Sequence, residues 1–69
     1  MQKYEKQNIE RFTFLSDEKL DLLKDNKIKT LGQLSQNTRN DLRKIGFENF
    51  EIKKIEVELQ LLGMALKEN

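Results

Sequence analysis

The sequence predicts an all-α fold, a compact bundle of four to five short helices. Apolar residues between Phe14 and Leu66 recur at steps of three and four, and no segment alternates with a period of two, which is the pattern of helices and not of strands. Each of the four apolar segments is opened by a hydroxyl or amide residue, the side chains that cap helix N-termini. With 69 residues, of which 36% are hydrophobic, the chain can form one domain with a single small core.

The first eleven residues are mostly polar and offer only Tyr4 and Ile9 as apolar anchors. We therefore expect residues 1–11 to be a flexible linker or a frayed helical lead-in, because such a segment can bury little apolar surface. Residues 12–66 are expected to form the ordered domain, and residues 67–69 a short tail.

The first helix is predicted from Asp17 to about Asp25. Ser16 precedes it as a hydroxyl cap, and acidic residues occupy the first turn, where the positive end of the helix dipole favours them. Asn26 follows the last turn and is the expected left-handed terminator, since asparagine tolerates positive φ better than most residues do.

Two short helices follow, each opened by a threonine. Thr30 and Gln33 have the spacing of a capping box, so a helix is predicted from Leu31 to about Gln36. Thr38 opens the third helix in the same way. That helix should end at Gly46, because glycine adopts positive φ without steric cost.

The fourth helix is the longest, with Asn49 as its expected cap and Gly63 as its expected C-cap. Its predicted buried face is formed by Ile52, Ile55, Leu59 and Leu62, which follow each other at steps of three and four.

The turn between the third and fourth helices has the sequence Ile45-Gly46-Phe47. A small apolar-glycine-apolar turn between two short helices is typical of a helix-hairpin-helix unit, as in SAM-like folds, which presents backbone amides to a phosphate. This pattern points towards nucleic acid. The alternative is that the turn is only a helix C-cap with two apolar neighbours.

Composition excludes several classes of function. The chain has no Cys and no His, so thiolate nucleophiles, imidazole acid-base chemistry and the usual zinc ligands are absent, and we expect no catalytic residue, metal or cofactor. No apolar run approaches the roughly 20 residues of a membrane span, so we expect a cytoplasmic protein with no membrane partner. The net charge of +1 is too small for strong non-specific attraction to DNA.

The elements occur in a recognisable order. They are Leu15-Ser16, Leu23-Lys24, Ile28, Thr30-Leu31-Gly32-Gln33-Leu34, Thr38, Leu42 with Lys44, Ile55, Leu59 and Leu62-Gly63-Met64-Ala65-Leu66. This order and spacing, over residues 12–66, resemble the C-terminal domain of the bacterial DNA-directed RNA polymerase alpha chain.

The resemblance implies a role in transcription. Such a domain is tethered to the RNA polymerase core subunits through the full alpha chain and contacts upstream promoter DNA, transcription factors or sigma factor. It belongs to a nucleotidyltransferase but performs no chemistry itself.

The family reaches the DNA minor groove with an arginine and an asparagine early in the first helix, and the aligned residues here are Glu18 and Asp21. In the family's Asn-x-Gly-x-Lys-Ser hairpin, counting back from Ile55 places Glu48, Phe50 and Glu51 on the Gly, Lys and Ser positions. Counting forward from Lys44 instead places Gly46 near the Gly position. Carboxylates repel phosphate, so family-style DNA binding is expected to be weak.

Five residues remain as candidate DNA contacts: Lys19, Gly46, Asn49, Lys53 and Lys54. Lys54 could equally pair with Glu58 on its own helix. Two other functions stay open: a protein-protein interaction module of the same fold that has lost DNA binding, and a helix-hairpin-helix domain from a repair or recombination protein.

Overall fold

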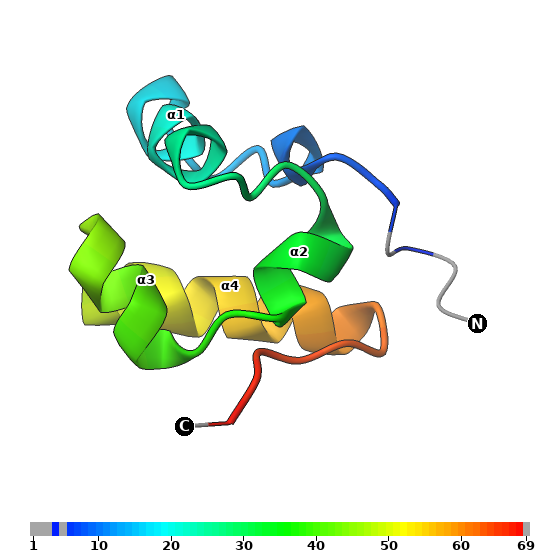
Figure 1. Ribbon diagram of the computed structural model, residues 1–69. Coiled ribbons are helices and arrows are strands. Elements are labelled where there is room, and N and C mark those ends of the chain that lie inside the picture. Colours follow the sequence, from blue (N-terminus) through cyan, green and yellow to red (C-terminus); the bar gives the residue numbers. More distant parts are fainter. Residues whose placement is uncertain (1–3, 5, 69) are drawn as a thin grey trace.

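Four α-helices and one turn of 3-10 helix form the domain (Figure 1). The computed structural model describes Tyr4 and residues 6–68. The helices are η1 (Ile9–Arg11), α1 (Asp17–Asp25), α2 (Leu31–Ser35), α3 (Arg39–Ile45) and α4 (Asn49–Leu61). The predicted all-α fold is confirmed, since the described residues contain no strand and only one isolated bridge, between Asn8 and Thr30.

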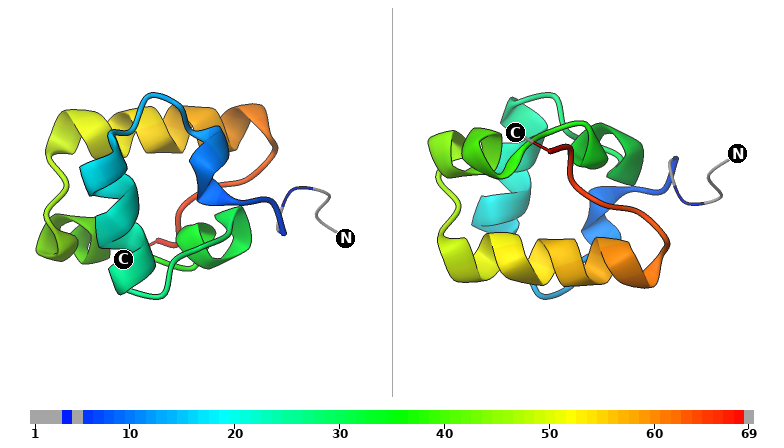
Figure 2. Two further views of the ribbon diagram at one scale, coloured as in Figure 1. Left: turned by 90° about the horizontal axis from the view of Figure 1, so that it is seen from above. Right: turned by 90° about the horizontal axis from the view of Figure 1, so that it is seen from below.

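The helices surround one core. In Figure 1, α1 lies on one side of the molecule, α3 and α4 lie on the other, and α2 stands between them. Figure 2 shows α4 along one outer edge, with the chain after it turning back across the molecule. This returning segment is fixed by the backbone N–H of Lys67, which donates to the carbonyl oxygen of Asn37 across 3.0 Å.

Every helix contributes apolar side chains to this core. Its buried members are Ile9, Phe12, Leu15, Leu20, Leu23, Ile28, Leu31, Leu34, Leu42, Phe47, Ile52, Ile55, Leu59, Met64 and Leu66. None of the helices in the described part of the chain combines the length and apolarity that crossing a membrane would require.

The predicted helix starts are confirmed at three of four positions. Ser16 accepts a hydrogen bond from the backbone N–H of Lys19, and both threonines form capping boxes. The prediction for α4 was wrong, because its N-cap is Glu48 and not Asn49. The side chain of Glu51 accepts a hydrogen bond from the backbone N–H of Glu48 across 2.9 Å, and this reverse contact holds the first turn.

Three helices end in the same way. At the ends of α1, α3 and α4, a residue of positive φ is followed by an apolar residue whose N–H bonds back to a carbonyl five positions earlier, which is the Schellman motif. The N–H to O distances are 2.9 Å for Ile28 to Leu23, 3.0 Å for Phe47 to Leu42 and 2.8 Å for Met64 to Leu59. All six of these side chains are buried, so each motif also directs an apolar residue into the core.

Glycine supplies the positive φ in two of these motifs, as predicted, with +128° at Gly46 and +76° at Gly63. In the remaining motif, at the end of α1, the predicted terminator was wrong. Asn26 has a φ of −99°, and the next residue, Lys27, takes the left-handed conformation with a φ of +64°. Ile28 determines which residue is left-handed, because in this motif the buried apolar residue directly follows the residue of positive φ.

The chain is already packed before Phe12. Ile9 is fully buried, and its N–H donates to the carbonyl oxygen of Lys29 across 3.1 Å. Glu10 accepts a hydrogen bond from Lys24, which raises the pKa of Lys24 above its ordinary value. The packed structure therefore includes part of the predicted lead-in. The parts of the predicted lead-in and tail that fall on residues 1–3, 5 and 69 lie outside the described residues.

Candidate interaction surface

Lys19 connects α1 to the turn between α3 and α4. Its ammonium donates a hydrogen bond to the carbonyl oxygen of Gly46 across 2.8 Å and lies 3.4 Å from a carboxylate oxygen of Glu51. It also lies 5.3 Å from the ring centroid of Phe47. The structure thus brings two predicted DNA contacts together, but it directs the lysine towards the protein, where the ammonium is occupied by internal partners.

The backbone amides of the α3–α4 turn are also used internally. The N–H of Gly46 donates to the carbonyl oxygens of Leu42 and Arg43, and the N–H of Phe47 donates to that of Leu42. The N–H of Glu48 is bound by Glu51. A turn that binds phosphate presents free N–H donors, and these three donors are occupied by partners within the chain.

Asn49 has a structural partner as well. Its side-chain oxygen accepts a hydrogen bond from Nε of Arg43 across 2.9 Å, which ties α3 to the first turn of α4. Arg43 also donates to the side chain of Asn40 across 2.8 Å. The amide side chain therefore stabilises the pair of helices.

The two lysines of α4 differ in their surroundings. Lys53 is exposed. The ammonium of Lys54 lies 5.3 Å from the ring centroid of Phe14, a cation-π contact. In the part of the chain that the structure describes, no ion pair joins Lys54 to Glu58.

Carboxylates surround the contact that Lys19 makes. Glu18 and Asp21 are exposed on α1, Glu48 is exposed in the turn, and Glu51 is partly buried against Lys19. Because the ammonium of Lys19 joins the start of α1 to the turn, Glu18 and Glu48 flank the same contact. These carboxylates repel phosphate, whereas Arg43 and Lys44 on α3, close to the same turn, are basic and exposed.

The outer face of α4 has the opposite character. Phe50, Val57 and Leu61 are the exposed large hydrophobic residues of the described chain, with 69%, 46% and 74% of their surface accessible. Together with Lys54 they follow steps of four, three and four, which places them in one line along the helix. We call these four residues the outer stripe.

The outer stripe lies opposite the buried face of α4. That buried face consists of Ile52, Ile55 and Leu59, which are at most 2% exposed. The helix is therefore apolar on both sides, although one apolar side is enough to hold it on the core. Figure 2 shows α4 at the edge of the molecule in both views.

Sequence reasoning singled out Phe50 as an altered family position, and it missed Val57 and Leu61. The available signal was the surplus of apolar residues in α4, which exceeds what a helix with a single buried face requires. The predicted buried face of α4 is confirmed for Ile52, Ile55 and Leu59, so the remaining apolar residues of the helix had to lie on another face.

Two shallow hollows occur elsewhere on the surface. One, of about 330 Å³, is lined by Arg39, Glu56, Leu66, Lys67 and Glu68. Its arginine is held by Glu56 across 2.7 Å, and this hydrogen bond raises the pKa of Arg39. The other, of about 320 Å³, is lined by Asn26, Asn37, Asp41, Lys44 and Ile45. No group of three or more acidic side chains that could hold a metal ion occurs among the described residues.

Comparison of the chain with protein-family models, with curated protein sequences and with solved structures found no match. The likeness to the RNA polymerase alpha C-terminal domain therefore rests on the order and spacing of the residues quoted above.

Proposed function

We propose that this domain is a protein-protein interaction module that acts as a tethered recruitment domain in transcription. It contacts its partner through the outer stripe of α4. One observation supports this proposal above all others: the three exposed large hydrophobic side chains of the described residues, Phe50, Val57 and Leu61, share one face of one helix.

Such an arrangement favours protein contact for an energetic reason. Fully burying a leucine or phenylalanine side chain contributes roughly 1.5 to 3 kcal/mol, so covering the stripe would supply a useful binding energy. Aromatic and aliphatic side chains surrounded by polar neighbours are also the usual centre of a protein interface. Single exposed apolar residues are common on proteins, whereas three in one line are not required by the fold.

The transcriptional setting comes from the resemblance. A recruitment domain needs only weak contacts, because a tether replaces bimolecular binding by a high effective concentration of the domain near its target. A small apolar stripe fits this requirement. On this proposal the alpha-like chain attaches the domain to the polymerase core, and a regulator or sigma factor is the target.

Heteronuclear NMR provides the test. The isotope-labelled chain is titrated with a purified sigma factor and, separately, with an A·T-rich DNA duplex at low salt. We expect the sigma factor to shift the amide resonances of Phe50, Val57 and Leu61 in the labelled chain. Replacing Phe50 and Leu61 together by serine should abolish these shifts, whereas Gln60→Ser, an exposed neighbour outside the stripe, should preserve them. Shifts that survive the double substitution would reject the stripe as the contact.

A second candidate function is contact with promoter DNA. Lys53 favours it, because this side chain is exposed in the first part of α4, and Arg43 and Lys44 are exposed on α3 close to the same turn. Basic side chains on both sides of a helix-helix turn could contact successive phosphates.

The duplex titration tests this candidate directly. Salt-sensitive shifts in residues 18–24 and 46–54 would support it, and their loss in the variant Lys53→Glu with Lys54→Glu would locate the contact. Absence of shifts at low salt would reject DNA binding and leave protein contact as the function.

A further inference from the structure

The outer stripe has a charge pattern of its own. Lys54 lies between Phe50 and Val57 in the stripe, and Glu58 lies one helical turn after Lys54, on the same flank of α4. With Glu58 beside it, the stripe thus has an apolar residue at each end and a cation, an anion and the apolar Val57 near its middle.

An interface between two identical chains must be self-complementary. In a twofold pair, if one residue of the first copy contacts a second residue of the other copy, then that second residue of the first copy contacts the first residue of the other. A helix face that pairs with itself in antiparallel orientation therefore needs opposite charges at equal distances on either side of its midpoint. Side chains on the same flank then meet across the twofold axis.

The outer stripe, together with Glu58, meets this requirement to within one residue. With the midpoint of α4 between Lys54 and Val57, Phe50 of one copy lies opposite Leu61 of the other, and Lys54 lies opposite Val57. Glu58 of the other copy is one residue further along on the same flank as Lys54, within reach of its ammonium. Each contact occurs twice, so two apolar pairs enclose two ion pairs.

We propose that the outer stripe of α4 binds the outer stripe of a second copy of this chain in antiparallel orientation. This inference rests on the function proposed above for the stripe as a protein-contact surface, and the second copy would compete with the regulator or sigma factor for it.

The charges favour this occupant over others. A parallel pair would place Lys54 opposite Lys54, which is a repulsive contact, and would put the two Glu58 side chains on opposite flanks of the pair. A strongly acidic or strongly basic partner would meet one matching charge and one opposing charge. The antiparallel second copy is the arrangement in which both charges find an opposite charge.

The expected dimer is weak. A helix of 13 residues is about 20 Å long, and a single pair of such helices buries less than the roughly 1,200 Å² of a standard stable interface. The dissociation constant should therefore be on the order of 0.1 to 1 mM, in the range of transient complexes.

Sedimentation equilibrium of the 69-residue chain over a series of concentrations up to about 1 mM measures this association. Leu61→Glu should weaken it at least about tenfold, because it places a charge in the apolar contact. Lys54→Glu and Glu58→Lys should each weaken it severalfold, since each creates two repulsive contacts across the interface.

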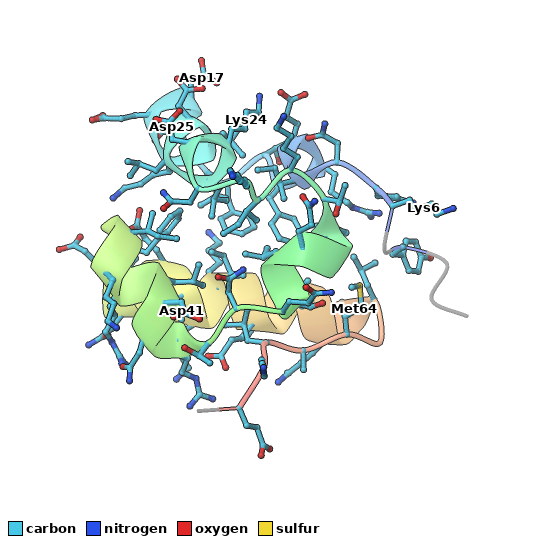
Figure 3. All side chains as sticks on the ribbon, viewed as in Figure 1. Lys6, Asp17, Lys24, Asp25, Asp41 and Met64 are labelled. Atoms are coloured by element: carbon cyan, nitrogen blue, oxygen red, sulfur yellow. The ribbon has the colours of Figure 1, made fainter. Side chains whose placement is uncertain are left out.

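The charge reversals provide an internal control. The double variant Lys54→Glu with Glu58→Lys should restore association, because the opposite charges return with exchanged positions. A mixture of the two single variants should associate more strongly than either variant alone. Asp25→Lys alters a side chain on α1, on the other side of the molecule from α4 in the view of Figure 3, and should leave association unchanged.

Circular dichroism melting of each variant verifies that it is folded. A chain that remains monomeric at 1 mM, or a double reversal that fails to restore association, would overturn the self-pairing. The titration with sigma factor tests the proposed function separately. Failure of the self-pairing can therefore be distinguished from failure of that function. Association that all stripe variants retain would place the contact between copies elsewhere and would also overturn the inference.

Discussion

Lys19 and Gly46, which are 27 residues apart in the chain, are joined by a hydrogen bond of 2.8 Å from the lysine ammonium to the glycine carbonyl oxygen. The same ammonium pairs with Glu51 across 3.4 Å. This contact fixes the first turn of α1 against the turn that connects α3 to α4. Lys19, which the sequence marks as a candidate DNA contact, therefore has a structural role in the domain.

Replacing Lys19 by methionine keeps the stem over Phe47 and removes the ammonium. The hydrogen bond and the ion pair are partly exposed, so we expect a loss of about 1 kcal/mol in the free energy of unfolding. Urea denaturation measures it, with Lys53→Met as the control at an exposed position. Equal stability of the two variants would show that the contact contributes nothing.

Local signals in the sequence were sufficient for the helix starts. Ser16, Thr30 and Thr38 act through the backbone N–H three residues ahead, and such a contact depends only on neighbouring residues. The cap of α4 was misplaced by one residue because Asn49 has the better capping side chain. Its amide instead binds Arg43 on the preceding helix, and this tertiary contact is not visible in the sequence.

The candidate site depended on contacts between distant residues and was less predictable. The lysine spacing gave no indication that Lys19 points towards Gly46 or that Lys54 lies on Phe14. For α4 the helical period predicted the buried face correctly, since Ile52, Ile55 and Leu59 are buried. It did not identify the second, exposed line of apolar residues on the opposite face.

The two positive-φ glycines should respond differently to alanine. An added Cβ at Gly46 would meet Leu22 Cδ1 at 3.6 Å, an ordinary contact, and at Gly63 it would meet nothing within 4 Å. Backbone conformation must therefore decide. The φ of +76° at Gly63 is close to the left-handed helical region, whereas +128° at Gly46 lies far outside it.

We expect Gly46→Ala to cost about 1 to 3 kcal/mol and Gly63→Ala about 1 kcal/mol, both measured by thermal and urea unfolding. Gly46→Val should cost at least as much as Gly46→Ala. An equal cost for alanine at the two positions would contradict the conformation of the α3–α4 turn.

Lys27 should be improved by glycine. It is the non-glycine residue with positive φ in the described chain, at +64°, in the position that Gly46 and Gly63 hold in the other Schellman motifs. Lys27→Gly removes a strain of about 1 to 2 kcal/mol and adds an entropy cost of about 0.5 to 1 kcal/mol, so a net gain of about 0.5 kcal/mol is expected. Lys29→Gly, at a position without positive φ, should only destabilise. A melting temperature that falls in both variants would exclude the left-handed conformation at Lys27.

The capping box of α3 should make stability depend on pH. The backbone N–H of Thr38 donates to the carboxylate of Asp41 across 3.0 Å and lowers the pKa of Asp41 below its ordinary value. A carboxyl group whose pKa is lower in the folded state stabilises the fold above its unfolded pKa of about 3.9, and this contribution disappears as the pH falls through the folded pKa.

Asp41→Asn removes this titration. The difference in the free energy of unfolding between the parent chain and Asp41→Asn should be constant above about pH 5 and should shift in favour of the variant as the pH falls below about 4. Urea unfolding at a series of pH values measures this difference, and the carboxyl carbon shift of Asp41 in NMR reports the pKa independently. A difference that stays constant down to pH 2 would mean that the Asp41 carboxylate does not hold the start of α3. The start of α3 would then be capped by the hydroxyl of Thr38 alone, which does not titrate in this range.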